Sequence, residues 1–113
     1  MRARLVCIDA AVVIDEIRLE KFPVTIGRSA DATICIPNEW ISRLHCVIDP
    51  DGEWLRVRDL RSRNGTFLNG DQITETLIKP GDKLTIGMST FLVQYDSHSA
   101  EMPSTVLYEP SLE

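Results

Sequence analysis

Three short segments of the chain concentrate the side chains best suited to hold a phosphate group. Arg28 follows a short apolar run directly after Gly27. The segment Ser42-Arg43-Leu44-His45 precedes another such run. The segment Arg61-Ser62-Arg63-Asn64-Gly65-Thr66 leads into a hairpin whose turn is Asn69-Gly70. The planar guanidinium of arginine matches a phosphate dianion, and serine hydroxyls and asparagine amides add hydrogen-bond donors. Such residues gathered on neighbouring loops of a rigid scaffold would recognise a phosphorylated group, although most surface arginines are only hydrated.

The turns and the apolar runs between them predict an all-β fold that would position these loops. Asn-Gly, Asp-Gly and Pro-Gly pairs recur along the chain, and such pairs supply the backbone angles of tight turns. The seven runs between them are short and rich in β-branched residues, and we expect strands over residues 4–8, 13–19, 24–27, 46–48, 54–59, 83–86 and 90–95.

Alternation within these runs indicates which side chains face the core. Leu55 and Val57 would point inward from one strand, and Phe91, Val93 and Tyr95 from another. The segments between the turns are too short for a long amphipathic helix. Two packed antiparallel sheets, a β-sandwich, are therefore the simplest architecture.

Length, charge and cysteine content narrow the function further. A chain of 113 residues with 43% hydrophobic residues is typical of one globular domain. The net charge of -5 argues against a general binder of nucleic acids or anionic membranes, which would need excess positive charge. Three cysteines without a CxxC pair predict a reduced, cytoplasmic protein without a zinc ribbon.

The two ends of the chain need separate interpretations. The basic start is followed by an apolar run that Asp9 interrupts, which favours a first strand over a signal peptide. We expect the domain to cover residues 1–96, and residues 97–113 to be a tail or linker that leads to a further domain. Thr105 in this tail could be modified by a kinase and then occupy the domain's own site. The plainer alternative, an unmodified linker, is the one we favour.

Taken together, the motifs resemble those of the forkhead-associated (FHA) domain, a family that binds phosphothreonine peptides. The matching elements follow the family's order and spacing over about residues 3–96, and they are Gly27-Arg28, Ser42-Arg43-Leu44-His45, Asn64-Gly65-Thr66, Asn69-Gly70, Gly81-Asp82 and Ile86-Gly87. The resemblance implies an eleven-stranded antiparallel β-sandwich whose binding loops gather at one end.

The resemblance also implies roles for three residues that would face the phosphate. Arg28 stands at the position of the family's principal phosphate-binding arginine. Ser42 stands at the position of the serine whose hydroxyl donates to a phosphate oxygen. Arg43 stands where many members add a second phosphate contact.

Other roles implied by the resemblance concern the peptide and the support of the loops. Asn64 matches the asparagine that hydrogen-bonds the ligand main chain, and Arg63 beside it could add charge toward phosphate or peptide. His45 would brace the loops by hydrogen bonds without touching the ligand, and no metal or other cofactor is expected. The residues expected to shape the loops or their turns are Gly27, Gly65, Asn69 and Gly70.

Plainer interpretations of the same residues stay open. Arg28 could pair with Asp31 at the surface, and Ser42 could serve only as a turn hydroxyl. Trp40 and Ile41 could belong to the core or line a pocket for a ligand side chain beyond the phosphothreonine, and we expect Trp40 to be exposed.

The function expected from these observations is phosphothreonine-dependent binding in kinase signalling, without catalysis. The chain carries neither a G-x-S-x-G nucleophile elbow nor a Walker-type lysine motif. One alternative is a phospho-independent docking or oligomerisation module that uses sheet faces and edges. A less favoured alternative is a nucleic-acid-binding β domain, because five of the nine arginines lie between residues 43 and 63. That alternative needs aromatic side chains among the charges, and Trp54 gives it thin support.

Overall fold

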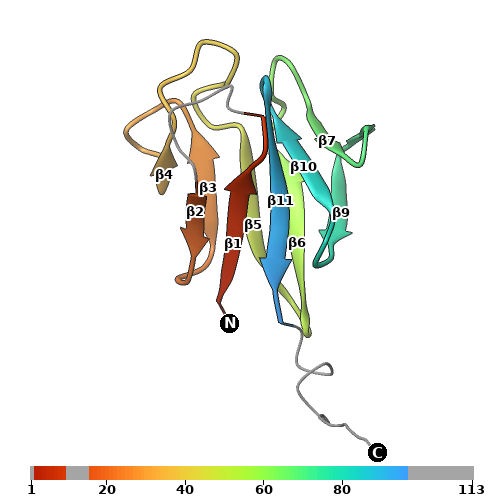
Figure 1. The fold of residues 1–113 in the computed structure, drawn as a ribbon. Coiled ribbons are helices and arrows are strands. Elements are labelled where there is room, and N and C mark those ends of the chain that lie inside the picture. The colour runs from red at the N-terminus through yellow and green to blue at the C-terminus, as the bar shows by residue number, and fades with distance from the viewer. Residues whose placement is uncertain (1, 10–15, 97–113) are drawn as a thin grey trace, which may run out of the picture.

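The computed structural model describes residues 2–9 and 16–96, and these residues form eleven strands and no helix. The strands build two sheets packed face to face, one of six strands and one of five (Figure 1). In spatial order, the first sheet consists of β2 (Glu16–Leu19), β1 (Ala3–Cys7), β11 (Ser89–Tyr95), β10 (Lys83–Ile86), β7 (Thr66–Leu68) and β8 (Asp71–Ile73). The second consists of β4 (Ile34–Cys35), β3 (Val24–Gly27), β5 (Cys46–Asp51), β6 (Trp54–Asp59) and β9 (Glu75–Ile78).

The β-sandwich expected from the sequence is confirmed, with one difference in strand direction. All neighbouring strands pair antiparallel except β3 and β4, which run parallel. Three predicted strands, β3, β6 and β10, have the predicted bounds. Residues 13–15 of the second predicted strand and the tail with Thr105 lie outside the described residues. None of the described segments forms a helix of the length and apolarity that crossing a membrane requires.

Four strands of the structure have no counterpart among the runs read from the sequence. β4, β7 and β8 contain two or three residues each, so they hold too few positions to show an alternating pattern. β9 has four residues, but two polar residues precede two apolar ones, so it shows no alternation. β5 also continues further than expected. It extends through Pro50 to Asp51, beyond the expected end at residue 48, and Pro50 is tolerated there at an exposed position.

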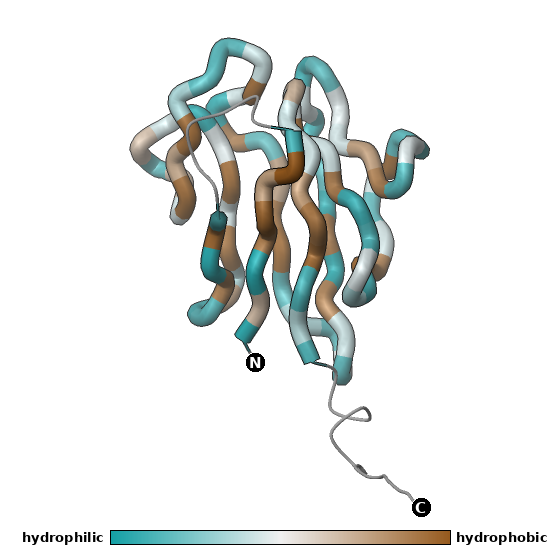
Figure 2. Tube along the Cα trace, in the orientation of Figure 1, coloured by the Kyte–Doolittle hydropathy of each residue, from teal (hydrophilic) through white to brown (hydrophobic). Residues whose placement is uncertain are grey.

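The hydrophobic core lies between the sheets and follows the predicted alternation. Phe91 and Val93 are fully buried on β11, and Leu55 and Val57 are fully buried on β6 in the other sheet. Figure 2 shows hydrophobic residues gathered along the strands and hydrophilic residues in the loops at the ends of the sandwich.

Tyr95 links the two sheets through its hydroxyl. This side chain belongs to β11 but its hydroxyl reaches between β6 and β9, where it accepts a hydrogen bond from the Leu55 amide (3.2 Å). The same hydroxyl donates to the carbonyl of Ile78. Burial is the main cause that raises the pKa of Tyr95, so the hydroxyl keeps the proton that this second bond requires.

Candidate functional site

The three motif-bearing loops meet at one end of the sandwich. These loops are residues 28–33 after β3, residues 36–45 between β4 and β5, and residues 60–65 between β6 and β7 (Figure 1). The strands beneath them are packed by the core, so the loops are held on a stiff base.

Backbone hydrogen bonds continue the pairing of β3 with β5 into the first two loops. The amide of Arg28 donates to the carbonyl of Ser42 (2.9 Å), and the amide of Ser29 donates to the carbonyl of Arg43 (3.1 Å). The structure thereby brings Arg28 and Ser42 side by side, although they lie on different connecting segments.

Gly27 permits this close approach because it has no side chain. A Cβ atom at this position would lie 2.0 Å from the carbonyl oxygen of Arg43, far inside van der Waals contact. The obstacle is backbone, so it cannot move aside as a flexible side chain would. Glycine is therefore the residue that lets the loop before β5 lie against the end of β3.

An open depression of about 660 Å³ lies between the three loops. The residues that line it are Arg28, Ser29, Asp31, Ser42, Arg43, Leu44, Arg61 and Arg63. Four of these eight residues are arginines and one is acidic, so the depression is positively charged although the chain has a net charge of -5. A positive concavity of this kind attracts and concentrates anions.

The guanidinium of Arg28 is anchored at one nitrogen. Its Nε donates to the carbonyl oxygen of Ile41 at 3.0 Å, and Ile41 itself is only 1% exposed. Among the ion pairs of the described residues, none joins Arg28 to Asp31. The anchor therefore fixes the guanidinium and leaves its two terminal nitrogens as donors for a ligand.

Ser42 connects two of the loops. Its hydroxyl oxygen accepts a hydrogen bond from the backbone amide of Arg63 (2.9 Å), and its own amide donates to Nδ1 of His45 (3.1 Å). A hydroxyl that accepts one bond can still donate its proton. Ser42 thus keeps a donor that a phosphate oxygen could accept.

His45 lies fully buried between the loops, and both of its ring nitrogens are used. Since Nδ1 accepts from the Ser42 amide, the proton of the neutral ring is assigned to Nε2, which donates to the carbonyl of Gly65 at 2.9 Å. This is the geometry that a bracing histidine requires, because it ties the loop before β5 to the loop before β7.

Asp59 holds the base of the loop between β6 and β7. Its carboxylate accepts hydrogen bonds from the Ser62 amide (3.0 Å), the Ser62 hydroxyl and the Thr66 hydroxyl (2.7 Å). The Ser62 hydroxyl oxygen in turn accepts from the amide of Gly65 (3.0 Å). Desolvation by partial burial pushes the pKa of Asp59 upward, but these hydrogen bonds outweigh it and hold the pKa below its ordinary value.

Asn64 follows the lining residue Arg63 in the chain and is not itself among the residues that line the depression. Its side-chain amide nitrogen donates to the carbonyl of Trp40 (2.9 Å), which leaves the side-chain oxygen as an acceptor. Trp40 is 46% exposed, as expected, whereas Ile41 beside it belongs to the core.

Asn69 and Gly70 form the turn between β7 and β8, at the end of β7 that is remote from the depression. Both residues have positive φ angles, 52° and 90°, as this type of tight hairpin turn requires. The Asn69 side chain also accepts from the amide of Lys83 (2.9 Å) and donates to Asp82 (3.1 Å). Asn69 thus holds the end of β7 against β10, and neither Asn69 nor Gly70 lines the depression.

The five arginines between residues 43 and 63 do not form one basic surface. Arg56 lies on β6 among three carboxylates, those of Asp49 (3.5 Å), Asp51 (3.8 Å) and Glu75 (3.4 Å). Trp54, on which the nucleic-acid alternative relied, lies at the far end of β6, where the Lys79 ammonium sits 5.6 Å from its ring centroid. The basic stretch is thus divided by the strand that runs through it.

Arg61 lines the depression, although no feature of the sequence predicted a separate role for it. Its backbone has φ = 56°, a left-handed conformation that non-glycine residues rarely adopt. The only signal in the sequence is its position in the run Arg61-Ser62-Arg63-Asn64-Gly65-Thr66.

The described site falls inside a segment that matches known proteins. A model of the FHA domain matches residues 24–87. Over 64 residues, 57% of this chain, the sequence is 44% identical to the ABC transporter ATP-binding/permease protein Rv1747 of Mycobacterium tuberculosis, of which 7% is covered. Over 85 residues, 74% of this chain, it is 34% identical to the FHA domain-containing protein FhaB of Mycolicibacterium smegmatis, of which 55% is covered.

Solved structures agree with the sequence relatives. An FHA domain studied for its phosphothreonine-dependent interactions superposes with a TM-score of 0.75 at 29% identity, covering 85% of this chain and 98% of that one. The chain spans 7% of the length of Rv1747 and about half, 55%, of the length of FhaB.

Proposed function

This chain belongs to the FHA domain family, and from that membership we propose that it binds protein segments carrying a phosphothreonine. The observation that carries the proposal is the position of Arg28 and Ser42, which lie side by side in a positively charged depression. The solved FHA domain with phosphothreonine-dependent interactions supports the choice of ligand.

The phosphate is captured by charge and by directed hydrogen bonds. A phosphothreonine carries a charge of about -1.5 to -2 and three acceptor oxygens at neutral pH. The terminal nitrogens of Arg28 and the hydroxyl of Ser42 donate to these oxygens, and Arg43 adds positive charge from the same lining. Because the Ile41 carbonyl holds the Arg28 guanidinium and the Arg63 amide donates to the Ser42 hydroxyl oxygen, little side-chain freedom is lost on binding.

The peptide is held at the rim of the depression. The side-chain oxygen of Asn64 accepts from a main-chain amide of the ligand, which fixes the path of the peptide without selecting its side chains. Arg63 contributes charge beside it. The mechanism is binding alone, and it requires neither a catalytic group nor a cofactor.

The proposal also covers the setting of the domain. We assign the FHA domain to residues 1–96 and its ligands to proteins modified by Ser/Thr kinases in the cytoplasm. Thr105, outside the described residues, is an additional candidate ligand if it is phosphorylated.

Titration with a phosphothreonine peptide library, beside the same peptides unphosphorylated, tests the proposal. Truncating one partner of a desolvated charge pair costs about 2 to 5 kcal/mol, so Arg28→Ala should lower affinity at least about thirtyfold. Arg58→Ala removes the same charge from an exposed position on β6 and is the matched control. If Arg28→Ala bound as tightly as the parent, the phosphate site would be assigned wrongly. Equal binding of unphosphorylated peptides would instead favour the docking alternative.

A further inference from the structure

We infer that the end of the sandwich that carries the three loops also docks on an anionic lipid surface. Its exposed apolar side chains insert between the lipid headgroups, and its arginines lie against the headgroup phosphates. This inference goes beyond the proposed function, because the ligand is a membrane surface and not a peptide. Two independent features of the molecule carry it, the placement of exposed apolar side chains and the distribution of charge.

The large apolar side chains that stay exposed in the described part of the chain all lie at the loop end. Each of them is between 44% and 58% exposed, and they are Ile8, Trp40, Leu44 and Met88. Ile8 follows the end of β1, and Met88 lies in the turn between β10 and β11. The other two belong to the loop before β5. Exposed apolar groups gathered in one region mark a surface that binds a partner.

Three of these residues, Ile8, Met88 and Trp40, form an apolar strip across the loop end. The amide of Ile8 donates to the carbonyl of Thr90 (3.0 Å), two residues after Met88. A Cβ atom built on Gly87 would lie 3.1 Å from the carbonyl oxygen of Trp40, so the turn with Met88 packs against the segment that carries this tryptophan. The strip therefore runs from the end of β1 across the β10–β11 turn to the loop before β5.

The apolar strip adjoins the loops that carry the arginines. The carbonyl of Trp40 accepts from the side-chain amide of Asn64 (2.9 Å), and Asn64 directly follows Arg63. The carbonyl of the next residue, Ile41, accepts from Nε of Arg28 (3.0 Å). Apolar groups beside basic groups are the combination that holds proteins at the interface of an anionic membrane.

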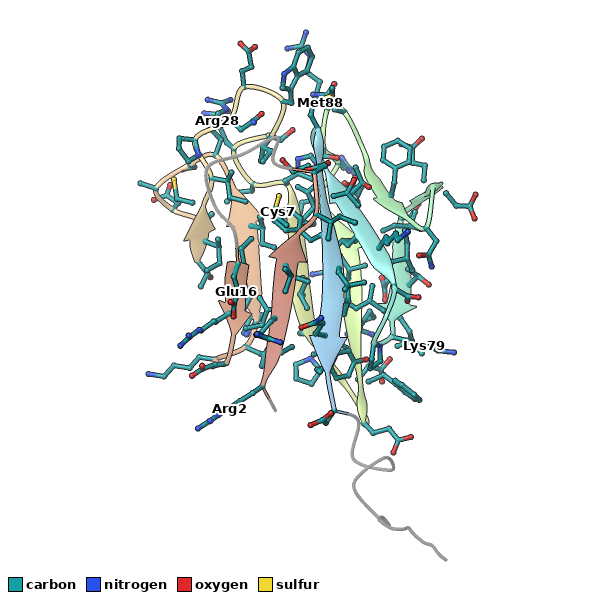
Figure 3. All side chains as sticks on the ribbon, viewed as in Figure 1. Arg2, Cys7, Glu16, Arg28, Lys79 and Met88 are labelled. Atoms are coloured by element: carbon teal, nitrogen blue, oxygen red, sulfur yellow. The ribbon has the colours of Figure 1, made fainter. Side chains whose placement is uncertain are left out.

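The charge of the molecule is divided unequally between the loops and the rest of the chain. The loops over residues 28–33, 36–45 and 60–65 contain four arginines against Asp31 and Glu39, an excess of two positive charges. The net charge of -5 therefore leaves an excess of seven negative charges on the rest of the chain. Figure 3 shows Arg28 and Met88 together at the loop end and Arg2 at the opposite end. An anionic surface attracts the loop end and repels the rest, which orients the domain with its loops toward the lipid.

The shape of the loop end favours a lipid surface over a second protein. The apolar strip is made by the tips of separate connections, whereas the depression between the loops has Leu44 as the one large apolar side chain among its described lining residues. Protein partners bind most strongly through side chains that fill well-packed pockets. Separate apolar tips instead insert between headgroups, a position in which tryptophan is favoured.

The negative net charge of the chain does not oppose this docking. It argues against a general membrane binder, but the excess negative charge lies outside the three loops. Only the surface that faces the lipid within about a Debye length contributes strongly to the attraction.

Vesicle binding tests the inference with the whole chain and without any peptide. The protein is mixed with vesicles of phosphatidylcholine alone or with about one third phosphatidylglycerol, and sedimentation gives the bound fraction. At about fivefold for each positive charge, an excess of two charges predicts about 25-fold stronger partition onto the anionic vesicles at low salt. This preference should shrink as salt rises.

Variants separate the charged and the apolar contributions. Arg61→Gln should lower partition onto anionic vesicles about fivefold. Met88→Ser should lower it about tenfold, the scale for burying one large apolar side chain. Arg2→Gln removes the same charge at the opposite end and should leave partition unchanged. Thermal unfolding confirms that each variant is folded.

The two tryptophans report which end of the molecule inserts. Trp40 belongs to the apolar strip, whereas Trp54 lies at the far end of β6. In the Trp54→Phe variant, anionic vesicles should shift the Trp40 emission to shorter wavelength and protect it from the aqueous quencher acrylamide. In the Trp40→Phe variant, the emission and quenching of Trp54 should stay unchanged.

The outcomes that overturn the inference are distinct from those that overturn the proposed function. Absent vesicle binding, equal binding to both vesicle types, or an equal loss from Arg2→Gln and Arg61→Gln would each overturn it. Binding that survives Met88→Ser and leaves Trp40 open to acrylamide would be adsorption by charge alone, and it would overturn the inference as well. Peptide titration tests the proposed function in separate samples, so either conclusion can fail while the other stands.

Discussion

Replacing Gly27 by alanine should separate loop placement from overall stability. The new Cβ would lie 2.0 Å from the Arg43 carbonyl oxygen, while real contacts stay beyond about 3 Å, so that backbone must retreat by about 1 Å. The retreat strains the hydrogen bonds from Arg28 to Ser42 and from Ser29 to Arg43. At about 0.5 to 1.5 kcal/mol each, their loss lowers the free energy of unfolding by about 1 to 3 kcal/mol.

The same shift acts more strongly on binding. It moves the Ser42 hydroxyl away from the Arg28 guanidinium, so the two groups can no longer donate hydrogen bonds to the same phosphate. A hydrogen bond to a charged group contributes about 1.5 to 3 kcal/mol, so phosphothreonine peptide affinity should fall at least about tenfold. Isothermal titration gives the affinity, and urea unfolding gives the stability of the same preparation.

Gly52→Ala is the matched control. Gly52 lies in the turn between β5 and β6, away from the loop end, with φ = 65° and open space around a built Cβ. Its left-handed backbone costs an alanine about 1 kcal/mol of stability. Affinity should not change. If Gly27→Ala bound within twofold of the parent, or if Gly52→Ala lost as much affinity, the argument from close approach would be refuted.

Three further predictions concern stability, pH and chemical reactivity. Tyr95→Phe removes the hydroxyl that joins the Leu55 amide to the Ile78 carbonyl. Because two buried groups lose their partner, the free energy of unfolding should fall by about 1 to 3 kcal/mol. Urea titration measures this change, and an unchanged free energy of unfolding would contradict the bridge. Since the folded-state pKa of Asp59 is lowered, its stabilisation is present above the unfolded value of about 3.9 and is lost as pH falls through the folded-state pKa. The difference in unfolding free energy between the parent and Asp59→Asn should therefore shrink from pH 6 to pH 3, and a constant difference would show that the carboxylate charge is unimportant. Burial raises the pKa of the Cys46 thiol, so a thiol reagent should label the exposed Cys35 in the native protein and Cys46 only after unfolding, whereas equal labelling rates would disprove the burial.

Strand positions and core faces could be predicted from the sequence where polar and apolar residues alternate along a strand. Phe91, Val93 and Tyr95 alternate with exposed or half-buried residues, and this period of two is a local property that each strand carries by itself. β7, β8 and β9 offer three or four positions each, so their assignment depends on the neighbours with which they pair. The number of strands came from the resemblance to a family and not from the pattern.

The residue types of the candidate site were also visible in the sequence, but their grouping was not. Arg43, Arg56 and Arg61 appeared to belong to one basic stretch. The tertiary structure separates them, because β6 carries Arg56 along a sheet among carboxylates while Arg61 lies beyond the end of that strand. Asp59, whose hydrogen bonds hold the loop, showed no distinguishing signal because an aspartate at a strand end is common.

By itself, the sequence determined the alternation that buries one face of each strand, the turn residues, and the supply of arginine, serine and asparagine between them. Only the tertiary structure decided which of these side chains share a surface. The alternation depends only on the backbone period of each strand. The proximity of Arg28 and Ser42 depends instead on the pairing of β3 with β5 and on Gly27, against which the Arg43 backbone lies. That pairing is a long-range contact, fixed by burying both strands in one core.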